Sequence, residues 1–409
     1  MTDLQTTFDA VPGFRAAGVA CGLKKAPGAL DLALIAADTP CVAAGVFTTN
    51  YVKAAPVLLD QERLATNASG IRAVVINAGV ANACTGAQGM KDAEQTAAVV
   101  AGEIGGAPGD VLVMSTGVIG VPLPLDKIAQ GVKAAAAALR PDGWPDAAQA
   151  IMTTDTRPKM AAVKVQSNGG SYTVAGIAKG AGMIAPNMAT MLCVVVTDAA
   201  LEPPALQTAL IAAATASFNQ IVVDGDMSTN DTVLLLANGA SGVRVEADEA
   251  LWAFRDALRQ VCVALAKAIV RDGEGVTRFL TLRVTGAPDV RSARRVANTI
   301  ATSPLVKTAF YGGDANWGRI LAAAGRAGVP LEADKLALWF APGEEGQDDG
   351  LQLVAGGAPT DYAEAAATDI VRQPAVRVRL DLGLGDAEAT VWTCDLSHDY
   401  VTINGSYRS

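Results

Sequence analysis

The chain has 409 residues, of which 51% are hydrophobic and 18% are charged, and its formal net charge is −9. This length exceeds one ordinary domain and the apolar content supplies a large core, so we expect two domains or three. The negative charge and the absence of a basic cluster exclude nucleic acid as an expected partner, whereas a small charged metabolite is compatible with them.

The cysteines and the single histidine restrict which metal, redox and catalytic sites the chain could form. The six cysteines are widely spaced and form no CxxC pair, so no zinc ribbon or thioredoxin-type site is expected and no metal is predicted. His398 is the only histidine, and we interpret it as structural; an acyl-transfer site would use an amine, a carboxylate or a lysine as base. The first residues lack a signal-peptide pattern and no apolar run reaches about 18 residues, which predicts a cytoplasmic protein without a membrane span.

The N-terminal region alternates predicted strands with predicted helices. Residues 31–38 and 41–47 favour two strands joined by a turn at Thr39 and Pro40. Apolar residues of strand or helix period predict the elements that follow. These are strands at 73–76 and 111–114, and helices at 91–104, at 125–139 and from 145 to 152. The alternation indicates an α/β fold.

The strand predicted at 111–114 runs directly into S-T-G at 115–117. The Thr116 hydroxyl and the Gly117 backbone N–H would then lie side by side, where both could donate to a developing oxyanion. Strand–Thr–Gly turns are also common structural elements, and the pattern alone does not choose between the two. The string N-A-G-V-A-N-A-C-T-G at 77–86 favours a structural turn after a strand in the same way.

A polar string, T-T-D-T-R-P-K at 153–159, predicts a loop at a rim after an apolar helix. Residues 160–166 and 172–177 then favour a β-hairpin that brings the chain to Lys179. The stretch K-G-A-G-M-I-A-P-N-M-A-T-M at 179–191 predicts irregular backbone, and the apolar run at 191–196 predicts a buried strand. Thr190 is the hydroxyl at this junction, where a rigid strand would support a nucleophile. The alternative is a Gly-rich loop that simply enters a core strand.

Two acidic strings lie further along the chain. D-G-D-M-S-T-N-D at 224–231 lacks the Glu that closes an EF-hand loop, so we interpret its Asp and Asn as turn residues. A long amphipathic helix is predicted at 248–271, and D-G-E-G at 272–275 follows it. Glu274, between two glycines, could point into a cleft. The alternative is a solvated acidic cap, although an acid there would oppose the helix dipole.

The C-terminal part returns to alternating strands and helices and predicts a second α/β unit. Strands are expected at 279–285, 337–340, 376–384 and 390–394, and helices at 293–299 and 361–371, with an Ala-rich helix opening at 314–320.

Several of these strings resemble the ornithine acetyltransferase family, also called bifunctional glutamate N-acetyltransferases of arginine biosynthesis. The strongest is K-G-A-G-M-I-A-P-N-M-A-T-M at 179–191, supported by N-A-G-V-A-N-A-C-T-G at 77–86 and by S-P-L-V-K-T-A with N-W-G-R-I between 303 and 320. The matching strings are spread over essentially the full length. One departure, Ala315 where the family pattern has proline, touches no catalytic role.

The resemblance implies a fold and a processing event. The expected fold is an α/β layered sandwich of the self-processing N-terminal-nucleophile type, with a second, smaller α/β domain. The expected domains are residues 1–276, residues 277–390 and a C-terminal segment, 391–409, that returns to the active site. Self-cleavage between Ala189 and Thr190 would give an alpha chain (1–189) and a beta chain (190–409), and two copies of each would form a heterotetramer.

The resemblance also implies roles for individual residues. Thr190 would be the N-terminal nucleophile, and Thr116 with Gly117 would form the oxyanion hole. Thr153, with Thr154 as its neighbour and alternative, would contact substrate. Glu274 would bind the amino end of ornithine, an anionic partner for a cation, and Asn404 with Ser409 would hold its carboxylate. The predicted substrate-binding residues are Thr153, Lys179, Thr190, Glu274, Asn404 and Ser409.

The implied activity is acetyl transfer from N2-acetyl-L-ornithine to L-glutamate through an acetyl-threonine intermediate. A freed α-amine near pKa about 8 can act as the base, so no histidine is required. No cofactor is expected, and the sequence neither selects nor excludes acetyl-CoA as a second acetyl donor. Two alternatives are a self-processing amidohydrolase or aminopeptidase that uses water as acceptor, and an unprocessed metabolite-binding protein without catalysis.

Overall fold

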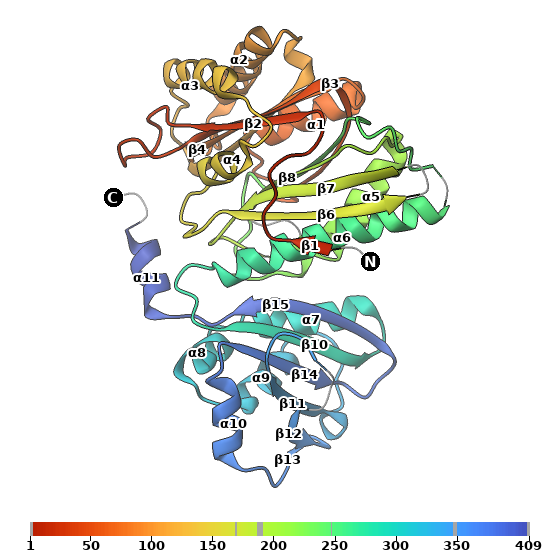
Figure 1. The fold of residues 1–409 in the computed structure, drawn as a ribbon. Helices are drawn as coiled ribbons and strands as arrows, with labels where there is room; N and C mark the ends of the chain where they lie inside the picture. The colour runs from red at the N-terminus through yellow and green to blue at the C-terminus, as the bar shows by residue number, and fades with distance from the viewer. Residues whose placement is uncertain (1–2, 168–169, 186–190, 247, 347–349, 407–409) are drawn as a thin grey trace. The chain divides into compact units, whose positions relative to one another are not determined.

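The computed structural model describes residues 3–167, 170–185, 191–246, 248–346 and 350–406. Contacts divide the chain into two units (Figure 1). The first runs from the N-terminus to Asn219 and continues over Asp226–Ile269, and the second contains Gln220–Gly225 and everything from Val270 onward. The division thus falls inside one long helix, before the boundary expected at 276, and the second unit takes in the segment expected at 391–409.

Within the described residues, a nine-stranded sheet forms the centre of the first unit, in the order β1-β6-β7-β8-β9-β3-β4-β5, with β2 paired to β3. The strands are β1 (Asp3–Gln5), β2 (Phe14–Val19), β3 (Leu32–Phe47), β4 (Ile71–Val80), β5 (Val111–Val118), β6 (Lys159–Ser167), β7 (Gly170–Lys179), β8 (Leu192–Thr197) and β9 (Thr232–Ala237). β6 and β7 form the predicted antiparallel hairpin, with Ser167 opposite Gly170.

The prediction of two strands at 31–38 and 41–47 is wrong, because both segments belong to the single strand β3. Its first half pairs with β2 and β4, and its second half pairs with β9. The register against β4 shifts between Ala36 and Cys41. Pro40 lies in this shift, where a residue without an N–H is tolerated because the regular ladder is already interrupted.

Helices of the first unit pack against two strand layers; most cover the outer faces (Figure 1), whereas the helix at Trp144–Ala150 contributes Trp144 to the apolar cluster between the layers. They are α1 (Ala55–Asn67), α2 (Gly86–Ile104), α3 (Leu125–Ala138), α4 (Trp144–Ala150), α5 (Pro203–Thr215) and α6 (Asp248–Arg271). One apolar cluster joins the inner faces of β3, β4 and β5 to those of β7, β8 and β9. A second joins the other face of β3, β4 and β5 to α2 and α3. On the opposite side Leu265 of α6 lies against Gly176 of β7. The expected α/β layered sandwich is therefore confirmed.

The second unit contains a six-stranded sheet in the order β13-β12-β11-β14-β10-β15 among its described residues. Its strands are β10 (Phe279–Ala287), β11 (Ala337–Pro342), β12 (Leu351–Ala355), β13 (Ala358–Pro359), β14 (Ala375–Asp381) and β15 (Ala387–Cys394). Its helices are α7 (Val290–Ala301), α8 (Pro304–Gly312), α9 (Trp317–Gly325), α10 (Glu364–Val371) and α11 (His398–Gly405). The second α/β unit is thus present, and β12 and β13 were not predicted.

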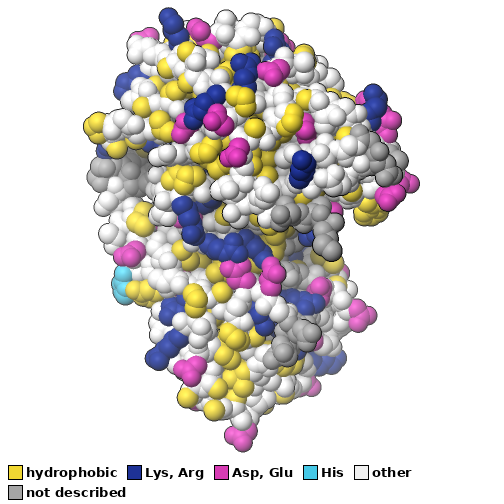
Figure 2. All heavy atoms as spheres, in the orientation of Figure 1, with side chains coloured by type: hydrophobic (Ala, Val, Ile, Leu, Met, Phe, Trp, Pro, Cys, Tyr) yellow, Lys and Arg dark blue, Asp and Glu magenta, His cyan; other side chains and the backbone are white. Residues whose placement is uncertain are grey.

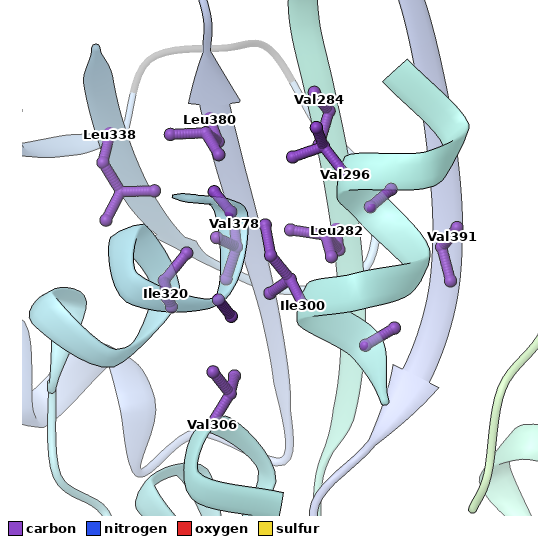
Figure 3. Packing of buried hydrophobic residues seen from close by; sticks show 14 of the residues in the cluster. Leu282, Val284, Val296, Ile300, Val306, Ile320, Leu338, Val378, Leu380 and Val391 are labelled. Atoms are coloured by element: carbon purple, nitrogen blue, oxygen red, sulfur yellow. The ribbon is translucent and has the colours of Figure 1, made fainter. Parts of the chain in front are cut away.

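The core of the second unit lies between one face of this sheet and its helices. Figure 3 shows Val296 and Ile300 of α7 pointing at Leu282 and Val284 of β10. Alternate residues of β10 and β14 are buried, which is the period-two pattern of a strand with one covered face. The strands expected at 279–285 and 376–384 are thus confirmed as β10 and β14.

The surface agrees with the mixed charge of the sequence. On the face drawn in Figure 2, Lys and Arg side chains are interspersed with Asp and Glu side chains. Among the residues that the structure describes, no helix is both long and apolar enough to cross a membrane.

Candidate active site

Four buried polar side chains gather at neighbouring ends of strands in the first unit. Thr116 lies near the end of β5, Lys179 is the last residue of β7, and Asp231 immediately precedes β9. Asp155 lies in the loop between α4 and β6. The exposed fraction is 3% for Thr116, 2% for Lys179, 0% for Asp231 and 8% for Asp155. Buried polar groups are costly unless they are bonded, so their partners identify what holds this site together.

Lys179 connects the predicted oxyanion residue to a carboxylate. Its Nζ donates to Thr116 Oγ1 over 3.4 Å and lies 3.9 Å from Asp155 Oδ2. An ammonium can only donate, so the Thr116 oxygen is the acceptor in this bond. The single hydroxyl hydrogen of Thr116 is then left to donate elsewhere, and the nearby positive charge strengthens it as a donor.

Asp155 is the anionic centre of this group. One carboxylate oxygen accepts from Lys159 Nζ and from the Gly180 backbone N–H, both at 2.6 Å, and the other accepts from the Thr153 N–H at 3.0 Å. Burial by itself would raise the pKa of Asp155, but Lys179 and then Lys159 outweigh it and lower that pKa to about 2. The carboxylate therefore stays charged at neutral pH and ties the Thr153 loop to the end of β7.

Gly117 follows Thr116 within β5 rather than in a turn after it, because the strand extends to Val118. Its φ is +132°, and a Cβ at this position would collide with the backbone of Gly79 in β4. Only glycine adopts this conformation without strain, and only glycine allows the two parallel strands to approach this closely. The predicted pair Thr116 and Gly117 is thus held side by side on a rigid strand.

The predicted cleavage site, Ala189–Thr190, lies outside the described residues. The chain on either side is described: Lys179 ends β7, and Met191, the residue after Thr190, is buried. Lys179 is paired with Leu192 across the β7–β8 ladder.

In the second unit, the structure brings two predicted substrate-binding residues together. Glu274, 8% exposed, follows α6, and Asn404 lies on the exposed surface of α11. Asn404 Nδ2 donates to Glu274 Oε2 at 2.7 Å and to the Tyr400 carbonyl at 3.0 Å. Ser409, the third predicted residue of this group, lies outside the described residues.

The start of α11 is fixed to the Glu274 loop. Ser397 Oγ donates to the Gly275 carbonyl at 2.6 Å, and the Tyr400 hydroxyl donates to Asp224 Oδ2 at 3.1 Å. His398 is exposed, and its Nδ1 lies 3.4 Å from the Tyr311 hydroxyl with the two rings edge to face. These contacts anchor the start of α11 within the second unit.

The sequence did not single out Asp155, Lys159, Asn230 or Asp231 as site residues. Asp155 belongs to the rim-loop string, and its signal was an acid four residues before a lysine; Asn230 and Asp231 were interpreted as turn residues. Thr153 contributes its backbone N–H to the Asp155 carboxylate, and the choice between Thr153 and Thr154 as the substrate contact stays a prediction. Among the described residues, no group of three or more His, Cys, Asp and Glu side chains is arranged to hold a metal ion.

Comparison with known proteins places these residues in a family. The family model described as "ArgJ family" matches residues 15–409. This chain belongs to the ArgJ family. It is 52% identical over 402 residues to the arginine biosynthesis bifunctional protein ArgJ of Geobacter sulfurreducens, covering 98% of this chain and 100% of that one. It is 50% identical over 400 residues to the protein of the same name from Symbiobacterium thermophilum, covering 97% of both.

A solved structure of ornithine acetyltransferase complexed with ornithine, from Mycobacterium tuberculosis, is 47% identical to this chain. It covers 46% of this chain and 98% of the solved chain, with a TM-score of 0.42. Membership of the ArgJ family confirms the resemblance to the ornithine acetyltransferases, and with it the prediction of an enzyme of arginine biosynthesis.

Proposed function

We propose that this member of the ArgJ family moves an acetyl group from N2-acetyl-L-ornithine to L-glutamate, giving L-ornithine and N-acetyl-L-glutamate. The observation that carries the proposal is the Lys179–Thr116 hydrogen bond at the end of β5 and β7. It leaves the Thr116 hydroxyl hydrogen available as an oxyanion donor, and Lys179 begins the same string that ends in Ala189 and Thr190.

The chemistry needs two acyl-transfer steps with Thr190 as nucleophile. Self-cleavage of the Ala189–Thr190 bond frees the Thr190 α-amine, which takes the hydroxyl proton as Thr190 Oγ attacks the acetyl carbonyl. The amide C–N bond breaks, ornithine leaves with that proton, and the acetyl group stays as a threonine ester. The amine of glutamate then attacks the ester carbonyl, the C–O bond to Thr190 Oγ breaks, the Thr190 α-amine passes the proton of the glutamate amine to that oxygen, and N-acetyl-L-glutamate leaves. Thr116 and Gly117 stabilise the oxyanion in both steps.

Recognition of ornithine is assigned to two groups. We propose that the ornithine ammonium binds the Glu274 carboxylate and replaces the Asn404 amide, which donates to it in this structure. Asn404 is then released to bind the substrate carboxylate together with Ser409. Thr153 and Lys179 are proposed as further contacts, both held by Asp155.

The proposal includes no bound cofactor. Acetyl-CoA is a second acetyl donor in this proposal, which is consistent with relatives that are named bifunctional. A cytoplasmic location and a heterotetramer of two 1–189 chains and two 190–409 chains are also parts of the proposal.

Intact mass spectrometry, followed by an assay with acetylornithine, tests the function. We expect fragments 1–189 and 190–409, and ornithine release that depends on glutamate after the first turnover. The Thr190→Ala variant, which cannot form the ester, should stay uncut and inactive. Equal ornithine release with and without glutamate would instead identify a hydrolase, and an active uncut chain would exclude Thr190 as an N-terminal nucleophile.

A further inference from the structure

Asn230 and Asp231 are adjacent buried polar residues that the proposed chemistry does not use. They end the D-G-D-M-S-T-N-D string and immediately precede β9. Asn230 is 5% exposed and Asp231 is 0% exposed. Turn residues of this kind normally face solvent, so complete burial requires specific partners for their side chains.

Asp231 holds the residue that follows the proposed nucleophile. Its Oδ1 accepts the Met191 backbone N–H at 2.9 Å, and the Met191 carbonyl accepts from Thr232 N at 3.2 Å. The Met191 nitrogen forms the peptide bond with Thr190, so this carboxyl group fixes one end of the peptide unit that the nucleophile belongs to. Burial raises the pKa of Asp231 well above its ordinary value.

Asn230 holds the residue that precedes the oxyanion donor. Its Nδ2 donates to the Ser115 carbonyl at 2.8 Å and to the Ala81 carbonyl at 2.7 Å. Its Oδ1 accepts from Thr229 Oγ1 at 2.7 Å, which fixes the orientation of the amide. The Ser115 carbonyl belongs to the peptide unit that ends at Thr116, so this bond fixes the backbone next to the Thr116 side chain.

β5 and β8 are not neighbours in the sheet: β9, β3 and β4 lie between them in the strand order. No ladder of backbone bonds therefore couples them directly. From consecutive positions, Asn230 contacts Ser115 of β5 and Asp231 contacts Met191, the residue before β8; their Cα atoms are about 3.8 Å apart across a trans peptide bond. The two residues therefore form a short, stiff connection between the end of β5 and the start of β8.

We infer that Asn230 and Asp231 are a positioning pair that sets the spacing between the oxyanion donor on β5 and the nucleophile that precedes β8. The inference rests on the proposed function for the identity of those two groups. Because a displacement of about 1 Å at reacting groups can slow a reaction about 10²-fold, loss of either side chain should affect turnover more than binding.

Asp198 supplies a matched control in the same unit. It is 3% exposed, its Oδ1 accepts the Thr173 backbone N–H at 2.6 Å, and burial raises its pKa. It follows Thr197, the last residue of β8, so it makes the same kind of bond at the opposite end of that strand. Its loss should lower stability without changing the spacing of the reacting groups.

The kinetic test compares Asn230→Ala, Asp231→Ala and Asp198→Ala in the full chain, with rates expressed per folded, cleaved molecule. We expect the first two to lower kcat about 10²-fold with KM nearly unchanged, and Asp198→Ala to keep kcat close to that of the parent. Asp231→Asn should recover most of the loss, because an amide oxygen can still accept the Met191 N–H. Equal kcat values in Asp231→Ala and Asp198→Ala would overturn the inference.

Hydrogen exchange of the Met191 amide tests the pair independently of activity. Exchange should accelerate in Asp231→Ala, stay unchanged in Asp198→Ala and be measurable even in a chain that fails to cleave. Unchanged exchange in Asp231→Ala would overturn the positioning role. A parent protein that lacks acetyl transfer would overturn the proposed function alone, since the exchange result would still stand.

Discussion

The residues assigned to acyl transfer and those assigned to ornithine differ in how they are held. Thr116, Lys179 and Asp155 lie on or beside strand ends and share an ion-paired network that is almost wholly excluded from solvent. In the second unit, Asn404 lies on an exposed eight-residue helix near the chain terminus and makes two described hydrogen bonds through its amide nitrogen. Strand-borne groups suit chemistry that depends on fixed distances, whereas a short exposed helix suits a contact that forms and breaks in each cycle.

The largest effect is expected from removing the charge at the centre of the first group. Asp155→Asn removes the carboxylate that pairs with Lys159 and Lys179, and breaking a buried ion pair costs about 3–5 kcal/mol. Chemical denaturation of the cleaved protein measures this loss in the free energy of unfolding. Asp198→Asn is the control, because that buried carboxyl bonds to the Thr173 backbone N–H and forms no salt bridge among the described residues. An equal loss of stability in both variants would contradict the network.

The same residue predicts a pH dependence of stability. Because the folded pKa of Asp155 is lowered from 3.8 to about 2, its contribution is present above about pH 4 and is lost as the pH falls through about 2. Asp155→Asn should lack this component, so the free energies of unfolding of parent and variant should converge in acid. Asp198, whose pKa is raised by burial, should contribute with the opposite sign. Parallel curves for parent and Asp155→Asn would show that the carboxylate is not stabilised by the lysines.

The next effect concerns the oxyanion donor. Thr116→Ala removes the hydroxyl that accepts from Lys179, and we expect kcat to fall about 10²–10³-fold with little change in KM. Thr116→Ser keeps a hydroxyl and should recover most of the rate. Steady-state kinetics with acetylornithine and glutamate measure both variants. If Thr116→Ala keeps the parent turnover number, Thr116 has no part in stabilising the oxyanion.

A smaller and more selective effect is expected at Glu274. Loss of a charge-assisted hydrogen bond to the ornithine ammonium costs about 1.5–3 kcal/mol, or roughly 10–150-fold in affinity. Glutamate carries a carboxylate at the corresponding end, so Glu274→Gln should weaken acetylornithine more than glutamate. Glu388→Gln, at an exposed ion pair with Arg283 in the same unit, is the control. Equal losses for both substrates would rule out this carboxylate as the group that recognises the side chain.

The smallest effect is expected at Asn404. Asn404→Ala removes the amide that is proposed to bind the substrate carboxylate; because this donor is uncharged and lies on an exposed helix, we expect a loss of about 0.5–1.5 kcal/mol. Weaker binding of both substrates, with kcat unchanged, is the expected result in the same assay. A fall in kcat comparable to that of Thr116→Ala would show that the exposed helix belongs to the reaction chemistry, and the contrast between the two groups would disappear.

Much of the fold followed from local patterns. The apolar spacing at 248–271 predicted α6 with the bounds that the structure has, and local patterns also predicted the β6–β7 hairpin and the strands β10, β11, β14 and β15 of the second unit. β3 was predicted as two strands because Thr39 and Pro40 resemble a turn, while the pairing that keeps the strand continuous comes from β2, β4 and β9. Such pairing is invisible in the local sequence.

Site residues could be predicted from the sequence only where they lie in a recognisable motif. Thr116, Gly117 and Lys179 were chosen from strings shared with a family, and the structure places Lys179 against Thr116. Asp155, Asn230 and Asp231 act through contacts with residues far away in the chain, such as Ser115 and Met191. In the local sequence their acidic and amide side chains are typical of loops and turns, so their hydrogen-bond partners could be found only from the folded chain.

The central claim is that a threonine freed by self-cleavage carries the acetyl group. The most direct measurement is rapid-quench intact mass spectrometry of the purified protein mixed with acetylornithine and no glutamate. The account predicts two fragments, 1–189 and 190–409, with one acetyl group on the second fragment, formed in a burst that Thr116→Ala slows and that added glutamate removes. An unmodified 190–409 fragment during active turnover, or an active chain that is never cut, would contradict it.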